Sequence, residues 1–346
     1  MASSWLAEVV RAEGGRVRFD RFMELALYHP QNGYYTKNIS TIGRTGDFST
    51  TATISRLLSA ALAEWIRSEA KALGLAPIVV IELGAGLGDI AKGILKRFGP
   101  FARIQYQIVE ISQPLIRQQK SQLKDRRVRW HTTVESALSV ARGKSIVFSN
   151  EFVDAFPCRR FTRGASGWAE IFLTLEDNRW REEAVPLQDD VETTAFSSSF
   201  GLGQFLEVQD AYRRWLQEFA LHFRLGSFLT IDYGGSPKEN YDRRPKGTIR
   251  GYFRHERVSG MDIYLRPGFQ DLTADVNFDD LKLWAEREGL QTIAYYSQAD
   301  FLRCWSPELL PANRAEFVSD PDGAGAAFKV LYQRKAHGGQ DKAGRA

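Results

Sequence analysis

The chain has 346 residues and a mass of 39.2 kDa, with 46 Lys+Arg against 42 Asp+Glu and a formal net charge of +4. An apolar content of 43% and a charged content of 25% exclude a disordered or fibrous chain, and the length allows one large α/β domain or two smaller ones. The two distant cysteines, Cys158 and Cys304, exclude a disulfide framework and a cysteine-based zinc site. The small charge surplus does not indicate a nucleic-acid partner or a membrane surface.

No segment approaches the ~18 uninterrupted apolar residues that a membrane span needs. The N-terminal stretch lacks the features of a secretion signal, and Glu8 and Glu13 argue against an organellar transit peptide. We therefore expect a cytoplasmic protein without a membrane span. The polar residues 336–346 predict a disordered tail.

The N-terminal part of the chain reads as helical. Residues 3–28 predict two helices separated at Gly14-Gly15, and Pro30 follows the second one. Residues 29–53 are rich in turn formers, and a loop of that length inside a compact protein is often functional. Apolar spacing predicts a long helix over 54–73. We assign residues 1–75 to an N-terminal helical region that contains this loop.

A strand–helix alternation begins after residue 75 and predicts a doubly wound α/β sheet with right-handed crossovers. The core that contains this alternation is assigned to residues 76–335. Antiparallel or irregular insertions interrupt the core near 158–205 and 234–276. The predicted strands cover 78–83, 103–111, 128–133, 145–151, 227–233, 291–297 and 327–333.

A glycine-rich segment, E-L-G-A-G-L-G-D, follows the first buried strand and contains Gly84, Gly86 and Gly88. Glycines here allow a sharp turn and a close approach of a ligand to the backbone. A dinucleotide fingerprint needs G-x-G-x-x-G, whereas the third glycine comes one residue early and Asp89 would repel a pyrophosphate. The spacing instead matches class I methyltransferases that use S-adenosylmethionine, whose ammonium group favours a nearby acid such as Glu82.

The second test of this hypothesis is an acid at the end of the next strand, which would bind the two ribose hydroxyls. Glu110 stands at that place, and we predict that Ile111 and Asn150 also contribute to the donor site. The alternative is a tight strand-to-helix turn with a chance acid on the neighbouring strand. The late strand and the final antiparallel pair agree with the seven-stranded, Rossmann-like methyltransferase sheet.

Several segments between residues 23 and 278 carry a family resemblance. They are Met23–Pro30 with Gly33–Tyr35, Gly46–Phe48 with Thr50, Ile54 and Ser55, Glu82–Gly88, Asn150–Pro157, Ile231–Gly234, Gly247–Tyr252 with His255, and Pro267–Gly268 with Gln270–Ala274. In their order they resemble the MidA-like class I methyltransferases, which include the mitochondrial arginine methyltransferase of complex I assembly. The resemblance implies a donor bound at the glycine motif and Glu110, and a protein arginine as the methyl acceptor. It also implies that residues 1–75 form a helical cover over the active site and carry an active-site loop.

The chain departs from the family pattern at several positions. Thr53 stands where the family usually has Glu, and Ala85 and Leu87 stand where it has Pro and Arg. Thr132 and Thr133 follow the third strand, where an acid is common. These departures leave the identity of the acceptor, and the activity itself, open.

Three acids are candidates for catalysis. Glu151 and Asp154 follow the fourth strand of the core, three residues apart on what we expect to be the first turn of a helix, and could hold a guanidinium group. The alternative is that they complement the helix dipole. Asp47, in the N-terminal loop, either reaches the donor or caps a turn.

The remaining predictions concern surroundings and partners. Arg250 reads as part of a solvated basic face, with Arg243, Arg244, Arg254 and Arg257 nearby, and Tyr34 and Tyr35 read as packing residues. The five histidines show no metal-ligand spacing, so we predict no metal. We expect a protein substrate, such as a respiratory-complex subunit or another arginine-bearing protein, and no nucleic acid; a homodimer stays open. The competing functions are an assembly factor that has lost its chemistry and a small-molecule methyltransferase.

Overall fold

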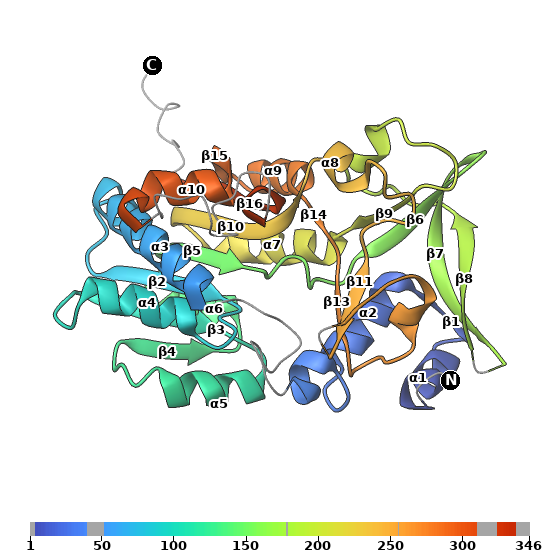
Figure 1. Ribbon diagram of the computed structural model, residues 1–346, viewed down its shortest axis with the longest axis horizontal. Helices are drawn as coiled ribbons and strands as arrows, with labels where there is room; N and C mark the ends of the chain where they lie inside the picture. The colour runs from blue at the N-terminus through green and yellow to red at the C-terminus, as the bar shows by residue number, and fades with distance from the viewer. Residues whose placement is uncertain (1–3, 40–51, 178, 255, 310–323, 337–346) are drawn as a thin grey trace, which may run out of the picture.

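The computed structural model describes residues 4–39, 52–177, 179–254, 256–309 and 324–336. One half of the molecule contains a twisted, mostly parallel sheet with helices on both faces, and the other half contains antiparallel strands and the first helices (Figure 1). The described helices include none that is long and apolar enough to cross a membrane.

The main sheet has the order β15-β16-β10-β5-β2-β3-β4, and β14 (Val276–Asn277) extends it by pairing with β10. The five strands from β10 to β4 are parallel, and β16 runs antiparallel to both of its neighbours. This topology confirms the seven-stranded doubly wound sheet. The strands are β2 (Ile78–Leu83), β3 (Ile104–Val109), β4 (Val128–His131), β5 (Lys144–Asn150), β10 (Leu225–Gly235), β15 (Gln291–Ser297) and β16 (Phe328–Lys335).

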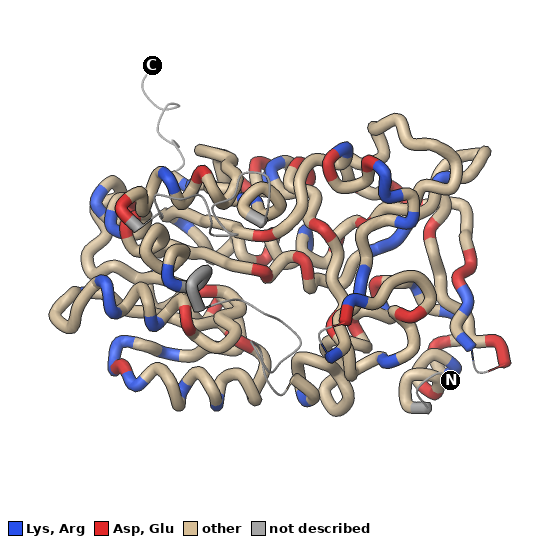
Figure 2. Tube along the Cα trace, viewed as in Figure 1, with Lys and Arg blue, Asp and Glu red and all other residues tan. Residues whose placement is uncertain are grey.

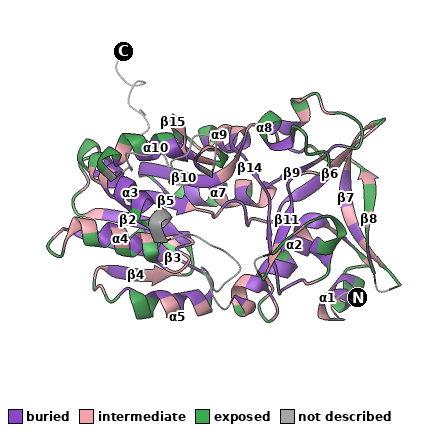
Figure 3. Cartoon of the chain, viewed as in Figure 1, coloured by how far each residue is buried: buried purple, intermediate pink, exposed green. Residues whose placement is uncertain are grey.

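Side chains on successive strand residues point to opposite faces of this sheet, and each face has its own core. Val80 and Ile146 pack under α3, α4 and α10, whereas Ile81 and Val147 pack under α6, α7 and α9. The interior strands are accordingly buried (Figure 3). The helices are α3 (Ala52–Ala72), α4 (Asp89–Phe98), α5 (Gln113–Gln122), α6 (Val134–Val140), α7 (Asp210–His222), α9 (Phe278–Arg287) and α10 (Gln298–Trp305).

Helix α3 belongs to the layer over the main sheet, although it lies in the predicted N-terminal cover. Its buried Glu69 accepts hydrogen bonds from Ser227 Oγ at 2.6 Å and from Arg334 Nη2 at 2.7 Å, and a further one from the Tyr332 hydroxyl. Because a buried carboxylate is costly without such donors, these contacts fix α3 against β10 and β16. The boundary at residue 75 stays a prediction.

The second half is built around a third core, in which α1 (Ser4–Ala12) and α2 (Phe19–Tyr28) pack against antiparallel strands. One sheet contains β1 (Arg16–Arg18), β6 (Arg159–Gly164), β7 (Gly167–Glu176), β8 (Arg179–Pro186) and β9 (Phe205–Val208). A smaller one contains β11 (Arg250–Phe253), β12 (Glu256–Val258) and β13 (Asp271–Thr273). Short helical turns occur in both halves: η1 (Tyr34–Asn38), η2 (Ala195–Ser197), η3 (Gly260–Tyr264), α8 (Pro237–Tyr241), η4 (Pro307–Leu309) and α11 (Ala324–Ala327). Of these, α8, η4 and α11 contact elements of the main-sheet half.

Candidate active site

A pocket lies at the carboxyl ends of β2, β3 and β5. Its opposite wall is formed by α2, η1 and β13, which belong to the antiparallel half of the molecule. Strands β2 and β5 are neighbours although β3 and β4 intervene in the chain, so the strand order reverses beside this pocket. Ligands bind at such switch points in open α/β sheets. Acidic residues gather at this edge of the sheet (Figure 2). The lining residues are Tyr28, Tyr35, Glu82, Gly84–Leu87, Asp89–Ile90, Glu110–Ile111, Leu115, Asn150–Phe152, Asp154–Ala155 and Asp271.

The glycine turn after β2 adopts backbone conformations that favour glycine. The φ angles of Gly84, Gly86 and Gly88 are 65°, 53° and 86°. A Cβ on Gly84 would meet the Phe152 ring at 3.0 Å, and one on Gly88 would meet Leu123 Cδ1 at 2.9 Å. Gly84 and Gly86 line the pocket, whereas Gly88 precedes α4 and faces Leu123 on the far side of the turn.

Glu82, the predicted partner of an ammonium group, is 2% exposed at the end of β2. Its Oε2 accepts a hydrogen bond from the Tyr106 hydroxyl at 2.7 Å. Burial raises the pKa of Glu82 to about 8, and the negative charges of Glu110 and Asp89 add to the rise. Burial disfavours the charged form of Glu82, and a cationic group that enters the pocket would offset part of this cost by pairing with the carboxylate.

Glu110 follows β3 and is held in a fixed orientation. Its Oε1 accepts from the Ser112 backbone N–H at 2.9 Å, and its Oε2 accepts from Gln119 Nε2 at 3.4 Å. The same Gln119 amide donates to the Gly86 carbonyl at 2.8 Å, which ties the glycine turn to α5. Burial raises the pKa of Glu110 to about 7. An oriented carboxylate beside a glycine turn suits two adjacent hydroxyl donors.

The chain after β5 forms a tight non-helical turn, so the expected helix start at Glu151 and Asp154 is wrong. The carboxylate of Asp232 replaces the helix: its Oδ2 accepts from the backbone N–H groups of residues 152, 153 and 154 at 3.2, 3.0 and 3.2 Å. Glu151 has a φ of 51°, which is unusual for a residue with a side chain. Asp232 is therefore the structural acid of this turn.

The turn places Glu151 and Asp154 in the pocket together, as predicted. Burial, with the charge of Asp154, raises the pKa of Glu151 to about 7. Burial raises the pKa of Asp154 to about 6, and its hydrogen bond from the Tyr233 hydroxyl limits the rise. The buried Oδ1 of Asp154 has no hydrogen-bond partner among the described residues. A carboxylate oxygen without a protein partner is available as an acceptor for a donor group of a ligand.

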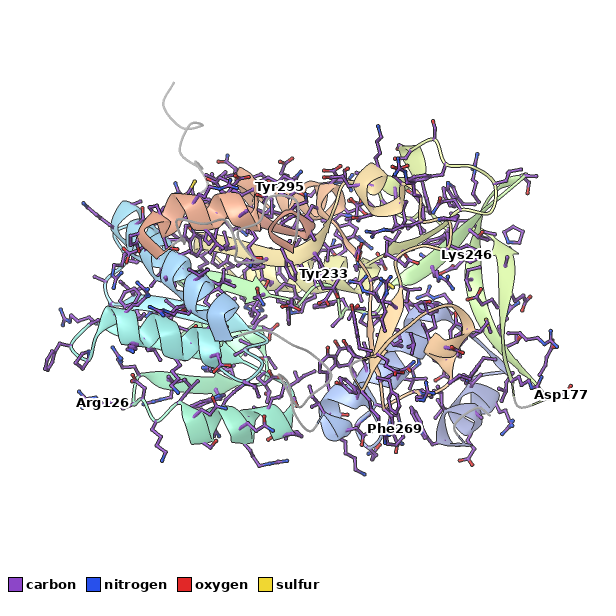
Figure 4. All side chains as sticks on the ribbon, in the orientation of Figure 1. Arg126, Asp177, Tyr233, Lys246, Phe269 and Tyr295 are labelled. Carbon is purple, nitrogen blue, oxygen red and sulfur yellow. The ribbon has the colours of Figure 1, made fainter. Side chains whose placement is uncertain are left out.

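Arg250 is buried. The prediction that it belongs to a solvated basic face is therefore wrong. Its guanidinium lies 4.4 Å from the centre of the Tyr233 ring, and its Nη1 donates to Asp275 Oδ1 at 2.5 Å. Tyr233 lies near the carboxyl end of β10 in the main sheet (Figure 4). Arg250 thus fixes the ring whose hydroxyl holds Asp154.

The pocket also contains residues that the sequence did not predict as functional: Tyr28, Tyr35 and Asp271. All three come from segments far from the glycine motif in the chain, and only the family-like segments around them gave a signal. Asp47, the third predicted catalytic residue, lies outside the described residues. Among the residues that the structure describes, no group of three or more His, Cys, Asp and Glu is arranged to hold a metal ion.

Comparison with known proteins identifies the family. Residues 61–296 match the model of a family described as "Putative S-adenosyl-L-methionine-dependent methyltransferase". The chain belongs to this MidA-like methyltransferase family.

Two curated relatives and one crystal structure are similar to this chain over most of its length. Protein arginine methyltransferase NDUFAF7 of Mus musculus is 27% identical over 84% of this chain and 70% of its own length. The Danio rerio protein of the same name is 29% identical over 78% and 69%. A COG1565 superfamily member from Burkholderia thailandensis, solved with S-adenosyl-homocysteine bound, superposes with a TM-score of 0.84 at 27% identity over 96% of this chain and 91% of that one.

The pocket of this MidA-like protein fits S-adenosylmethionine as its cofactor. The glycine turn presents the backbone of Gly84 and Gly86 to the pocket without a side chain. Glu82 offers a carboxylate to the ammonium, and Glu110 offers one to the ribose hydroxyls. All of the predicted donor-site residues except Gly88 line this pocket, including Ile111 and Asn150. Their individual roles in binding stay predictions.

Proposed function

We propose that this S-adenosylmethionine-dependent methyltransferase methylates an arginine side chain of a protein. The observation that carries the proposal is the pair of pocket carboxylates, Glu151 and Asp154, on the turn beside the donor half of the pocket. The curated relatives with about a quarter of their residues identical are protein arginine methyltransferases, which supports the same acceptor.

The pocket has two halves with different chemistry. Glu82 interacts electrostatically with Glu110 and Asp89 around the glycine turn, and this half holds the cofactor. Glu151 and Asp154 interact with each other on the 151–154 turn, and this half faces the acceptor. The bound cofactor supplies a methyl group on a sulfonium, which is already activated for in-line displacement. The protein therefore has to position the acceptor and exclude water.

Two carboxylates can fix a planar guanidinium by parallel N–H···O hydrogen bonds and direct one nitrogen toward the donor. The attacking nitrogen must also lose a proton. The pKa values of about 7 for Glu151 and about 6 for Asp154 lie close to neutral pH, where a general base is most effective. Asp154, with its unpaired Oδ1, accepts the guanidinium, and Glu151 takes the proton.

The test uses a donor with a deuterated methyl group. The purified protein is incubated with this donor and an extract of cells that lack the protein, and mass spectrometry locates the labelled residues. The proposal expects label on arginine, lost with Asp154→Asn and retained with Asp190→Asn, an exposed acid outside the pocket. Label on other residues, or on small molecules alone, would refute the arginine acceptor. Donor binding without any transfer would favour an assembly factor that keeps only the fold.

A further inference from the structure

The acceptor half of the pocket is assembled from three segments that lie far apart in the sequence. The 151–155 turn is joined to α2 because the Tyr28 hydroxyl donates to the Ala155 carbonyl at 2.9 Å. The same turn is joined to the segment after β13 because the Ala274 N–H donates to the Asp154 carbonyl at 3.1 Å.

The third contact joins η1 to the segment that precedes β13. Asn38, at the end of η1, donates from Nδ2 to the Gly268 carbonyl at 2.7 Å. A Cβ on Gly268 would meet the Asn32 carbonyl oxygen at 2.1 Å, so the two backbones approach as closely as glycine allows. The segment that carries Tyr35 therefore lies directly on the segment that leads to Asp271.

Two aromatic rings come together at this junction. Tyr28 and Tyr35 stack with ring centres 5.6 Å apart and an interplanar angle of 16°, and both line the pocket. Burial raises the pKa of both phenols well above its ordinary value, and the negative charge of Asp271 adds to the rise. Both tyrosines therefore stay neutral, and the charges on this side of the pocket are those of the carboxylates.

We propose that Tyr28, Tyr35 and Asp271 form, with Asp154, a subsite that selects a planar cationic acceptor, a guanidinium, over a neutral group of the same shape. The aromatic pair offers π-electron density, and Asp271 and the unpaired Oδ1 of Asp154 offer negative charge. A neutral group of the same shape has no positive charge to pair with these carboxylates. This inference rests on the proposed function and adds the residues that determine its specificity.

The subsite can be tested without turnover. Binding of n-butylguanidinium and of n-butylurea, its neutral planar analogue, is measured by ligand-observed NMR on the full chain, with and without saturating S-adenosyl-homocysteine. We expect n-butylguanidinium to bind at least tenfold more tightly. Tyr35→Leu should reduce this binding at least tenfold and Tyr35→Phe should keep it, while Phe101→Leu, which changes a 96% exposed ring, should have no effect.

Asp271→Asn should remove most of the preference for the cation, and the Tyr35 variants keep the test decisive if this buried substitution prevents folding. Equal binding of the two probes to the unmodified protein, or unchanged guanidinium binding in Tyr35→Leu, would overturn the subsite. The calorimetric affinity for S-adenosyl-homocysteine, measured on the same samples, reports on the methyltransferase pocket separately. Intact cofactor binding and methyl transfer without a guanidinium preference would therefore refute the subsite and leave the methyltransferase standing.

Discussion

At the scale of single residues, the site is a set of carboxyl groups whose pKa values are raised by burial to near neutral pH. Glu82, Glu110, Glu151 and Asp154 have raised pKa values of about 8, 7, 7 and 6. Groups with such perturbed pKa values in a cleft are typical of functional sites. The fold tolerates them because each accepts at least one hydrogen bond.

The first prediction concerns Glu110. Glu110→Gln replaces the charged acceptor of two hydroxyl hydrogen bonds by a neutral amide, and a hydrogen bond to a charged group is worth about 1.5–3 kcal/mol. The affinity for S-adenosyl-homocysteine should therefore fall about 10- to 100-fold. Isothermal titration calorimetry measures the change, with Glu24→Gln as a control at an exposed carboxylate of α2. An unchanged affinity would show that Glu110 does not bind the ribose.

The second prediction concerns pH. Because burial raises the pKa values of Glu82 and Glu110, both are protonated at low pH, whereas an ammonium and ribose hydroxyls need carboxylates. Binding should release protons, and the affinity for S-adenosyl-homocysteine should rise between about pH 6 and pH 8, by up to about tenfold per pH unit for each group. Titrations in buffers of different ionisation enthalpy measure both effects. An affinity that falls over this range would contradict the assignment.

At the scale of elements, the turn after β5 depends on Asp232. Three backbone N–H groups converge on one of its oxygens, and the Tyr233 N–H donates to the other at 2.9 Å. Asp232→Asn replaces one of these two accepting oxygens by an NH2 group, which cannot accept, so the free energy of unfolding should fall by about 2–4 kcal/mol. Urea denaturation measures the loss against Asp190→Asn, an exposed control. A loss as small as that of the control would exclude this role for Asp232.

The position of Tyr35 depends on the turn at Gly33. A Cβ there would lie 2.5 Å from the His29 nitrogen and 2.7 Å from the Leu27 carbonyl oxygen. Gly33→Ala should therefore destabilise the fold by about 1–3 kcal/mol and weaken the binding of n-butylguanidinium. Gly201→Ala, where the added Cβ meets nothing within 4 Å, is the matched control. Thermal unfolding compares the two, and equal stability would show that η1 can shift freely.

The elements of the main sheet could be predicted from the sequence because apolar runs and glycines encode them locally. The positions of the predicted donor-site residues in the pocket were predictable for the same reason, since each lies near or just after the end of a strand. Their roles in binding stay predictions. The 151–154 turn was not predictable, because its hydrogen-bond acceptor, Asp232, lies on another strand. Tyr35, Asp271 and Arg250 acquire their surroundings only when distant segments meet, so their burial and contacts have no local pattern.

At the scale of the whole molecule, the pocket joins the two halves of the chain, because its lining comes from α2, η1, the main sheet and β13. A ligand in the pocket therefore stabilises the folded chain as a whole. At 100 times its dissociation constant, S-adenosyl-homocysteine should add about 2.7 kcal/mol to the free energy of unfolding. The thermal midpoint should rise by several degrees in scanning fluorimetry, and adenosine alone should give a smaller rise. No rise at saturation would mean that the ligand does not bind the folded protein.

The most direct test is a crystal structure of this protein with S-adenosyl-homocysteine bound. The account predicts the ribose hydroxyls on Glu110, the amino group beside Glu82 or Asp89, and the sulfur facing Glu151 and Asp154. A ligand bound outside this pocket, or a sulfur directed away from the 151–154 turn, would contradict it.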